Sequence, residues 1–115
     1  MKFSINRNTW LRGEGAEASR LLRFADKKMC CLGFYLRACG VPTQILLGAN
    51  TPYAIRGSVP KEAAWLLHPY VADMSALMEE NDSYYVTEKG RERRIKEIFA
   101  RHSVLVEFEG VPTRE

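Results

Sequence analysis

The side chains best suited to nucleophilic chemistry in this chain are three thiols, Cys30, Cys31 and Cys39, which share one short segment. A cysteine at the start of a helix is favoured as a thiolate, because the free backbone amides and the helix dipole stabilise negative charge. Cys30 and Cys31 stand at the start of a helix that we expect over 29–39. Such a pair serves as a nucleophile, as metal ligands or as small packing residues, and the sequence leaves these uses open.

A thiol enzyme also needs a base, and the chain has two histidines, His68 and His102. The segment Cys31-Leu32-Gly33-Phe34 resembles the nucleophile helix of papain-like cell-wall peptidases, which place a histidine at the start of a strand. His68 lies in no expected strand, and His102 adjoins the last expected strand without a marked polar partner. Because the constellation is incomplete, we predict no catalytic residue and no enzymatic activity. A thiol-dependent enzyme using Cys30 or Cys31 is the second alternative function.

The spacing of the cysteines does not suit a metal site. Adjacent cysteines do not form the Cys-x-x-Cys chelate, and Cys39 is nine residues from Cys30. We therefore predict no metal ligand and no cofactor.

The positive charge is concentrated in the first half of the chain. The net charge is +3, but residues 1–57 hold nine Lys and Arg against three Asp and Glu, whereas residues 58–115 hold eight against eleven. Either the two halves attract one another within one fold, or the N-terminal cations form a surface for an anionic partner. For the second case we predict a binding surface of aromatic anchors and arginines, made by Trp10, Arg12, Arg20, Arg23, Tyr53 and Arg56.

Two other anionic partners are compatible with the same residues. Aromatic and cationic side chains alternate near the N-terminus, as they do in proteins that bind single-stranded nucleic acid directly, although the sequence pI of about 8.9 is only moderately basic. A small anionic nucleotide could bind beside the loop that contains Gly13 and Gly15, since glycine permits close approach of the backbone. Nucleotide binding is the first alternative function.

Length and composition indicate one globular domain over residues 1–115, with 46% hydrophobic and 27% charged residues. No stretch approaches the roughly 20 apolar residues of a membrane span, so we expect no membrane partner. The odd number of cysteines and the lack of a signal-peptide pattern predict a cytoplasmic location.

The expected fold is α+β, with a small antiparallel sheet packed against two to four helices. Alternating apolar residues predict strands at 2–6 and 104–109. Helices are expected at 29–39, 58–67, 71–80 and 87–101, with Gly40 ending the first, Ser58 capping the second and Thr87 capping the last. An unpaired edge strand near either terminus would allow a homodimer.

The chain also resembles a group of small phage and prophage proteins of unassigned function. The resemblance lies in Trp10-Leu11-Arg12-Gly13-Glu14-Gly15, Ser19-Arg20-Leu21-Leu22, Met29-Cys30-Cys31-Leu32-Gly33-Phe34 and Gly40. It brings no catalytic residues, but it implies an accessory protein of a mobile element in a bacterial cell. We therefore predict non-catalytic binding to a host protein or a protein–nucleic acid complex, with inhibition of bacterial defence in the manner of an anti-CRISPR protein as the implied role.

Overall fold

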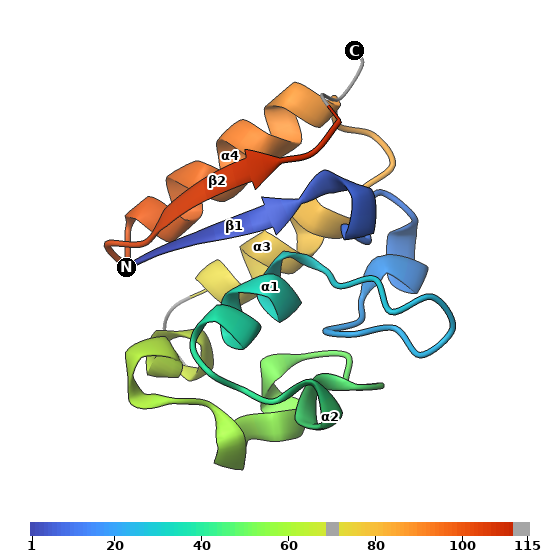
Figure 1. Cartoon of the computed structure of the whole chain (residues 1–115). Helices are drawn as coiled ribbons and strands as arrows, with labels where there is room; N and C mark the ends of the chain where they lie inside the picture. The colour runs from blue at the N-terminus through green and yellow to red at the C-terminus, as the bar shows by residue number, and fades with distance from the viewer. Residues whose placement is uncertain (69–71, 112–115) are drawn as a thin grey trace.

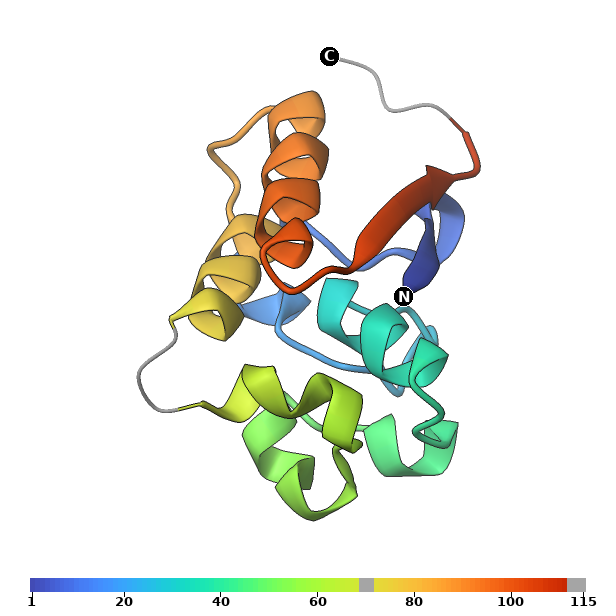
Figure 2. The ribbon, with the colours of Figure 1, turned by 90° about the vertical axis from the view of Figure 1, so that its left-hand side faces the viewer.

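The computed structural model describes residues 1–68 and 72–111, and it is rich in helix (Figure 1). A sheet of two strands lies in front of the longest helix, and a central helix packs below it (Figures 1 and 2). The strands are β1 (Lys2–Asn6) and β2 (Leu105–Glu109), and the α-helices are α1 (Cys31–Ala38), α2 (Thr43–Leu46), α3 (Asp73–Asp82) and α4 (Glu88–Ala100). Short 3-10 helices occupy Arg7–Thr9, Gly15–Ala18, Pro52–Ser58 and Lys61–Leu67.

The two strands are parallel, so the prediction of an antiparallel sheet is wrong. Lys2 pairs with Leu105 at one end of the sheet and Asn6 with Glu109 at the other. The direction follows from α4, which returns the chain to the beginning of β1, where the Leu105 amide donates to the Met1 carbonyl at 2.9 Å. Parallel strands always need such a crossover, and here nearly the whole chain supplies it. Both predicted strands are confirmed in position.

Helix α1 is the centre of the hydrophobic core, as its nearly uniform apolar character predicts. Leu32, Tyr35 and Leu36 are fully buried, and the Tyr35 ring packs against Phe99 of α4 with centroids 5.1 Å apart. Gly33 lies so close to the Leu21 backbone that a Cβ atom there would overlap the Leu21 carbonyl oxygen. The helix is therefore held against the segment that precedes it.

The predicted helix ends are partly confirmed. Thr87 caps α4 by accepting a hydrogen bond from the Gly90 amide at 3.0 Å, and Gly40 follows α1 with a φ of 100°. The helix expected over 58–67 is instead a 3-10 helix that begins after Pro60, so Ser58 is not its cap. The helix expected over 71–80 is observed two residues later, and residue 71 lies outside the described residues.

No helix in the two described ranges is both long enough and apolar enough to cross a membrane.

Candidate functional site

The paired thiols face the interior. Cys30 precedes the first turn of α1, as predicted, but both Cys30 and Cys31 are buried. Burial raises the pKa of Cys30 to about 11 and also raises the pKa of Cys31, because the low-dielectric interior disfavours the thiolate more than the helix dipole favours it. Neither sulfur is in the state that a nucleophile or a metal ligand requires. Between residues 1–68 and 72–111, no group of three or more His, Cys, Asp and Glu is arranged to hold a metal ion.

His102 has a carboxylate partner that the sequence did not reveal. Its Nε2 lies 2.7 Å from Oδ2 of Asp73, and its ring stacks on Trp65 with centroids 3.7 Å apart. Burial raises the pKa of Asp73, but hydrogen bonds from His102 and Arg101 outweigh burial and hold that pKa below its ordinary value. None of the hydrogen bonds that the structure describes for His102 reaches a thiol. The histidine and carboxylate thus lack a nucleophile, and His68 is exposed after a 3-10 helix.

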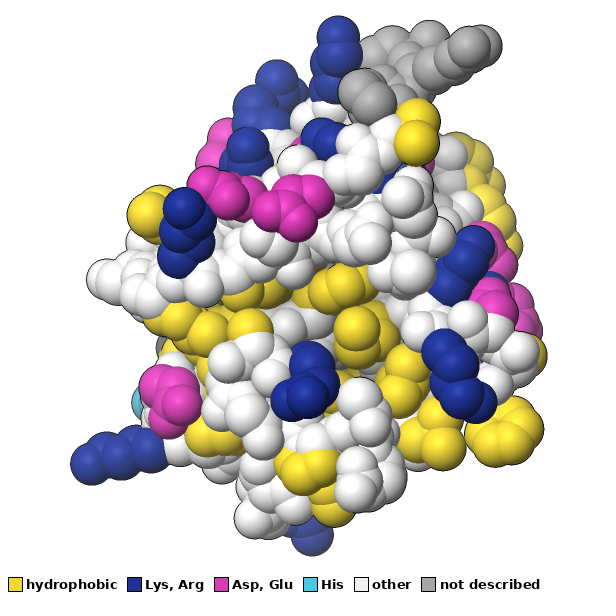
Figure 3. Space-filling model, viewed as in Figure 1, with side chains coloured by type: hydrophobic (Ala, Val, Ile, Leu, Met, Phe, Trp, Pro, Cys, Tyr) yellow, Lys and Arg dark blue, Asp and Glu magenta, His cyan; other side chains and the backbone are white. Residues whose placement is uncertain are grey.

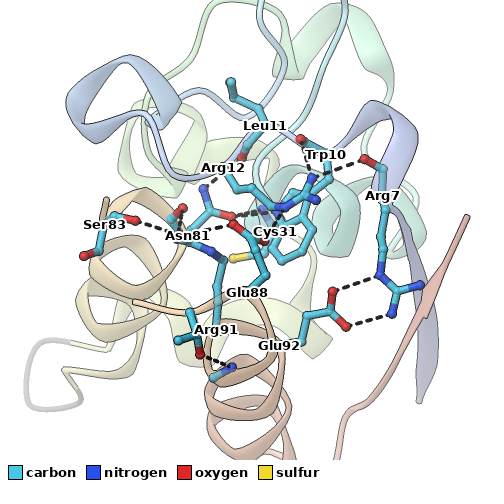
Figure 4. Close-up of polar contacts among 12 residues, drawn as sticks. Arg7, Trp10, Leu11, Arg12, Cys31, Asn81, Ser83, Glu88, Arg91 and Glu92 are labelled. Carbon is cyan, nitrogen blue, oxygen red and sulfur yellow. Dashed lines mark hydrogen bonds and ion pairs between the residues drawn. The ribbon is translucent and has the colours of Figure 1, made fainter. Parts of the chain in front are cut away.

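Trp10 is buried and belongs to a polar network beneath the sheet (Figure 4). Asn81 organises this network: its Oδ1 accepts from the Trp10 indole at 2.8 Å and from the Cys31 amide at 3.0 Å, and its Nδ2 donates to the Leu11 carbonyl at 3.0 Å. With only 2% of its surface exposed, Trp10 cannot serve as a surface anchor in this structure. Its role is to join the N-terminal segment to α1 and α3.

Arg91 forms the second part of the network and was not anticipated. It is 1% exposed and donates to the carbonyls of Glu80, Asn81 and Ser83 at 2.6 to 2.8 Å. These carbonyls lie at the end of α3, where a cation compensates both unpaired acceptors and the helix dipole. The sequence of α4 is rich in Glu and Arg, which is typical of an exposed helix. It therefore contains no signal that Arg91 is buried.

Two N-terminal arginines pair with α4, which supports the attraction between the two halves (Figure 4). Arg7 makes two hydrogen bonds of 2.8 Å to the Glu92 carboxylate, and the Arg12 Nε lies 2.8 Å from Glu88. Arg12, predicted as a binding residue, is therefore already engaged within the fold, and part of the charge asymmetry is neutralised internally.

Except for Arg23, the cations of the next segment are not neutralised in this way. Residues 18–61 contain seven Lys and Arg and one acidic residue, Asp26, which pairs with Arg23 at 2.6 Å. The other cations of this segment form no ion pair with any described residue, and they are Arg20, Lys27, Lys28, Arg37, Arg56 and Lys61. Positive charge is therefore left over around α1, α2 and the 3-10 helices.

A tight turn at 23–28 presents an aromatic ring to solvent. Phe24 is 72% exposed, and the Lys27 Nζ lies 4.2 Å from the centre of its ring. Asp26 fixes the turn by accepting hydrogen bonds from the Arg23 guanidinium and the Lys28 amide. Lys27 has a φ of 60°, a left-handed backbone conformation that is unfavourable for residues other than glycine.

A groove of about 410 Å³ separates this turn from α2. It is lined by Leu22, Lys27, Met29, Thr43, Gln44 and Leu47. Gln44 also borders a second hollow of about 600 Å³ on the other side of α2, which Ile45 and Arg56 line as well. We name the turn at 23–28, the groove and this hollow together the α2 surface.

The α2 surface contains two of the predicted binding residues, Arg23 and Arg56. Tyr53 is exposed. It lies beside the α2 surface, because its carbonyl accepts a hydrogen bond from the Arg56 guanidinium at 3.3 Å. Arg20 lies on the segment before the turn, where its guanidinium donates to the Ser19 carbonyl at 2.8 Å. In Figure 3, apolar side chains gather below the sheet and continue toward the lower right, with cationic side chains among them.

The loop at Gly13 and Gly15 is less suited to an anion than the sequence suggested. A neighbouring cleft of about 520 Å³ is bordered by Gly15 and by the acidic side chains Glu79 and Asp82. A Cβ at Gly15 would meet the Tyr84 hydroxyl, so glycine here accommodates a side chain of the protein itself. The two carboxylates disfavour a nucleotide phosphate in this cleft.

Comparison of the chain with protein-family models, with curated proteins and with solved structures finds no match. Its function is therefore inferred from its own residues.

Proposed function

We propose that this chain is a non-catalytic binding domain that recognises a protein partner through the α2 surface. One observation carries the proposal: exposed apolar side chains and unpaired cations lie together on one preformed face, around a groove. Among the described residues, Cys30 and Cys31 are buried, and the pair of His102 and Asp73 has no nucleophile beside it. Both observations argue against a catalytic site.

The exposed apolar side chains of the α2 surface support a role in binding. Phe24, Ile45 and Leu47 are all large and exposed, although a folded chain of this size could have covered them. Contiguous exposed apolar residues with a polar rim mark interaction sites, and aromatic and arginine side chains provide much of the binding energy at such sites. Covering the Phe24 ring would contribute about 2 kcal/mol from apolar area alone.

The biological setting is proposed from the resemblance to phage and prophage proteins. In that setting the partner is a bacterial host protein or a protein–nucleic acid complex, and the domain inhibits a defence system by covering a surface that the system needs. Such occlusion requires no reaction, which agrees with a site built of contact residues.

A pull-down from bacterial lysate tests the proposal with three versions of the tagged protein. The wild-type chain should retain a partner that a Phe24→Asp, Arg56→Glu variant does not retain. Tyr85→Asp is the matched control, because Tyr85 is also an exposed aromatic residue but lies between α3 and α4. Equal capture by wild type and the double variant would rule out the α2 surface as the binding site.

A further inference from the structure

We infer that the groove beside α2 binds a protein segment in which a large apolar side chain is flanked by carboxylates. This inference rests on the proposed function, and it specifies the chemistry of the partner at that same surface.

The floor and walls of the groove define the apolar part of the ligand. Leu22, Met29 and Leu47 line the groove, and Leu47 remains 37% exposed. The segments that carry Leu22 and Leu47 are joined through their backbones, since the Gly48 amide donates to the Leu22 carbonyl at 2.9 Å. A preformed apolar groove of this size suits an inserted side chain, because no protein group must move to admit it.

The cations at the rim define the charge of the ligand. Lys27 lines the groove, Lys28 follows it in the turn, and Arg56 lines the hollow across α2. The one carboxylate of the turn does not balance these cations, because Asp26 already pairs with the Arg23 guanidinium at 2.6 Å. On α4, by contrast, glutamates pair with cations from elsewhere in the chain, as Glu92 does with Arg7. At the groove the complementary charge is left to the partner.

The turn itself is ordered before binding. The Lys27 amide donates to the Arg23 carbonyl at 2.9 Å and its Nζ donates to the Phe24 carbonyl at 2.8 Å. Phe24 is thus presented in a fixed position beside the groove, so binding would not have to order the loop first.

The same residues argue against two other occupants. A phosphate or nucleic acid is bound best by arginine forks and clusters of backbone amides, whereas the groove offers leucine, methionine and a lysine at its edge. A second copy of the chain docking by the same face would bring two cationic surfaces together, which is repulsive.

Selection from a phage-displayed library of random peptides, with the intact protein as bait, tests the inference. We expect enriched peptides that contain a large apolar residue with Asp or Glu beside it. Their affinity should fall about tenfold or more in Leu47→Asp and about three- to tenfold in Lys27→Glu, and it should weaken as salt is raised. Arg93→Glu, a charge reversal on an exposed residue of α4, and Leu105→Asp, on β2, are the matched controls and should bind as wild type does.

Several outcomes would overturn the inference. They are enrichment of basic or uncharged peptides, enrichment that Leu47→Asp and Lys27→Glu leave unchanged, and no enrichment at all. Binding of a labelled oligonucleotide or of anionic lipid vesicles that Lys27→Glu abolishes, without acidic peptides being selected, would assign the surface to those ligands instead. If the pull-down depends on Phe24 and Arg56 but acidic peptides fail, the inference fails while the proposed function stands. If the pull-down is insensitive to those residues, the proposed function fails.

Discussion

Trp65 and His102 stack face to face, with ring centroids 3.7 Å apart and ring planes only 9° from parallel. The contact joins the 3-10 helix Lys61–Leu67 to the end of α4, and Asp73 adds the beginning of α3 by bonding to the imidazole at 2.7 Å. The Trp65 indole also donates to the Tyr35 hydroxyl of α1 at 3.0 Å. One aromatic cluster therefore connects four helical segments, and Phe3 of β1 packs against its Tyr35 ring with centroids 5.4 Å apart.

Replacing Asp73 with asparagine should destabilise the protein by about 1–2 kcal/mol at neutral pH, because the carboxylate receives charged hydrogen bonds from Arg101 and His102. The pKa of Asp73 is lower in the folded protein than in the unfolded chain, so the unfolded state binds more protons and the stabilisation is present above the unfolded pKa of about 3.9. It is lost as the pH falls through the lower folded pKa. Urea unfolding of both proteins at pH 7 and pH 3 should show the difference shrinking at low pH, and a constant difference would contradict this account.

Replacing Asn81 with alanine should cost about 3 kcal/mol of unfolding free energy. The change leaves the Trp10 indole, the Cys31 amide and the Leu11 carbonyl buried without their partner, and each loses a hydrogen bond that water cannot replace. Asn50→Ala is the control, because Asn50 is exposed. A loss below about 1 kcal/mol by urea unfolding would show that the network contributes little to stability.

The sequence predicted the elements whose signals are local. The Thr87 cap, the Gly40 stop and the alternation in β1 and β2 depend on neighbouring residues, and each was found in place. The direction of strand pairing and the burial of Trp10 depend on partners far away, since Trp10 and Asn81 are 71 residues apart. The periodicity of apolar residues along the sequence carries no information about which distant segment packs against a given face of a strand or helix.

The candidate site was predicted only in part, for a related reason. Arg23 and Arg56 are on the α2 surface, but Phe24, Lys27 and Leu47 are not among the six predicted binding residues. One local signal was available, because a phenylalanine between an arginine and an Asp-Lys-Lys turn is poorly placed for a core. Arg12 and Trp10 show the opposite case. Both were predicted as surface residues, but Arg12 pairs with Glu88 within the fold and Trp10 is buried.

Gly33→Ala should destabilise the protein by about 3 kcal/mol or prevent folding, because the new methyl group would overlap the Leu21 backbone rather than a movable side chain. Gly57→Ala offers a matched control, since a Cβ at Gly57 meets nothing within 4 Å. Thermal unfolding should place the control near wild type. Equal stability of the two variants would show that α1 does not pack against residue 21 as described.

Thiol reagents should distinguish the three cysteines. Cys30 and Cys31 are buried and the pKa of Cys30 is about 11, so neither should react in the native protein at pH 8, whereas the partly exposed Cys39 should react slowly. All three should react in denaturant. Rapid native reaction of two thiols, measured by the release of a chromogenic thiol, would reopen the possibility of a reactive pair at the start of α1.

The pairing of β1 with β2 has a consequence for how the protein is made. Phe3 and Ile5 are synthesised long before their neighbours in the sheet, Val106 and Phe108. Strand β1 therefore lacks its partner until residues 105–109 have been made, and a chain cut short before residue 105 would be left with part of its interior open to water. A premature stop shortly before residue 105 should thus be as harmful to this molecule as a much earlier one.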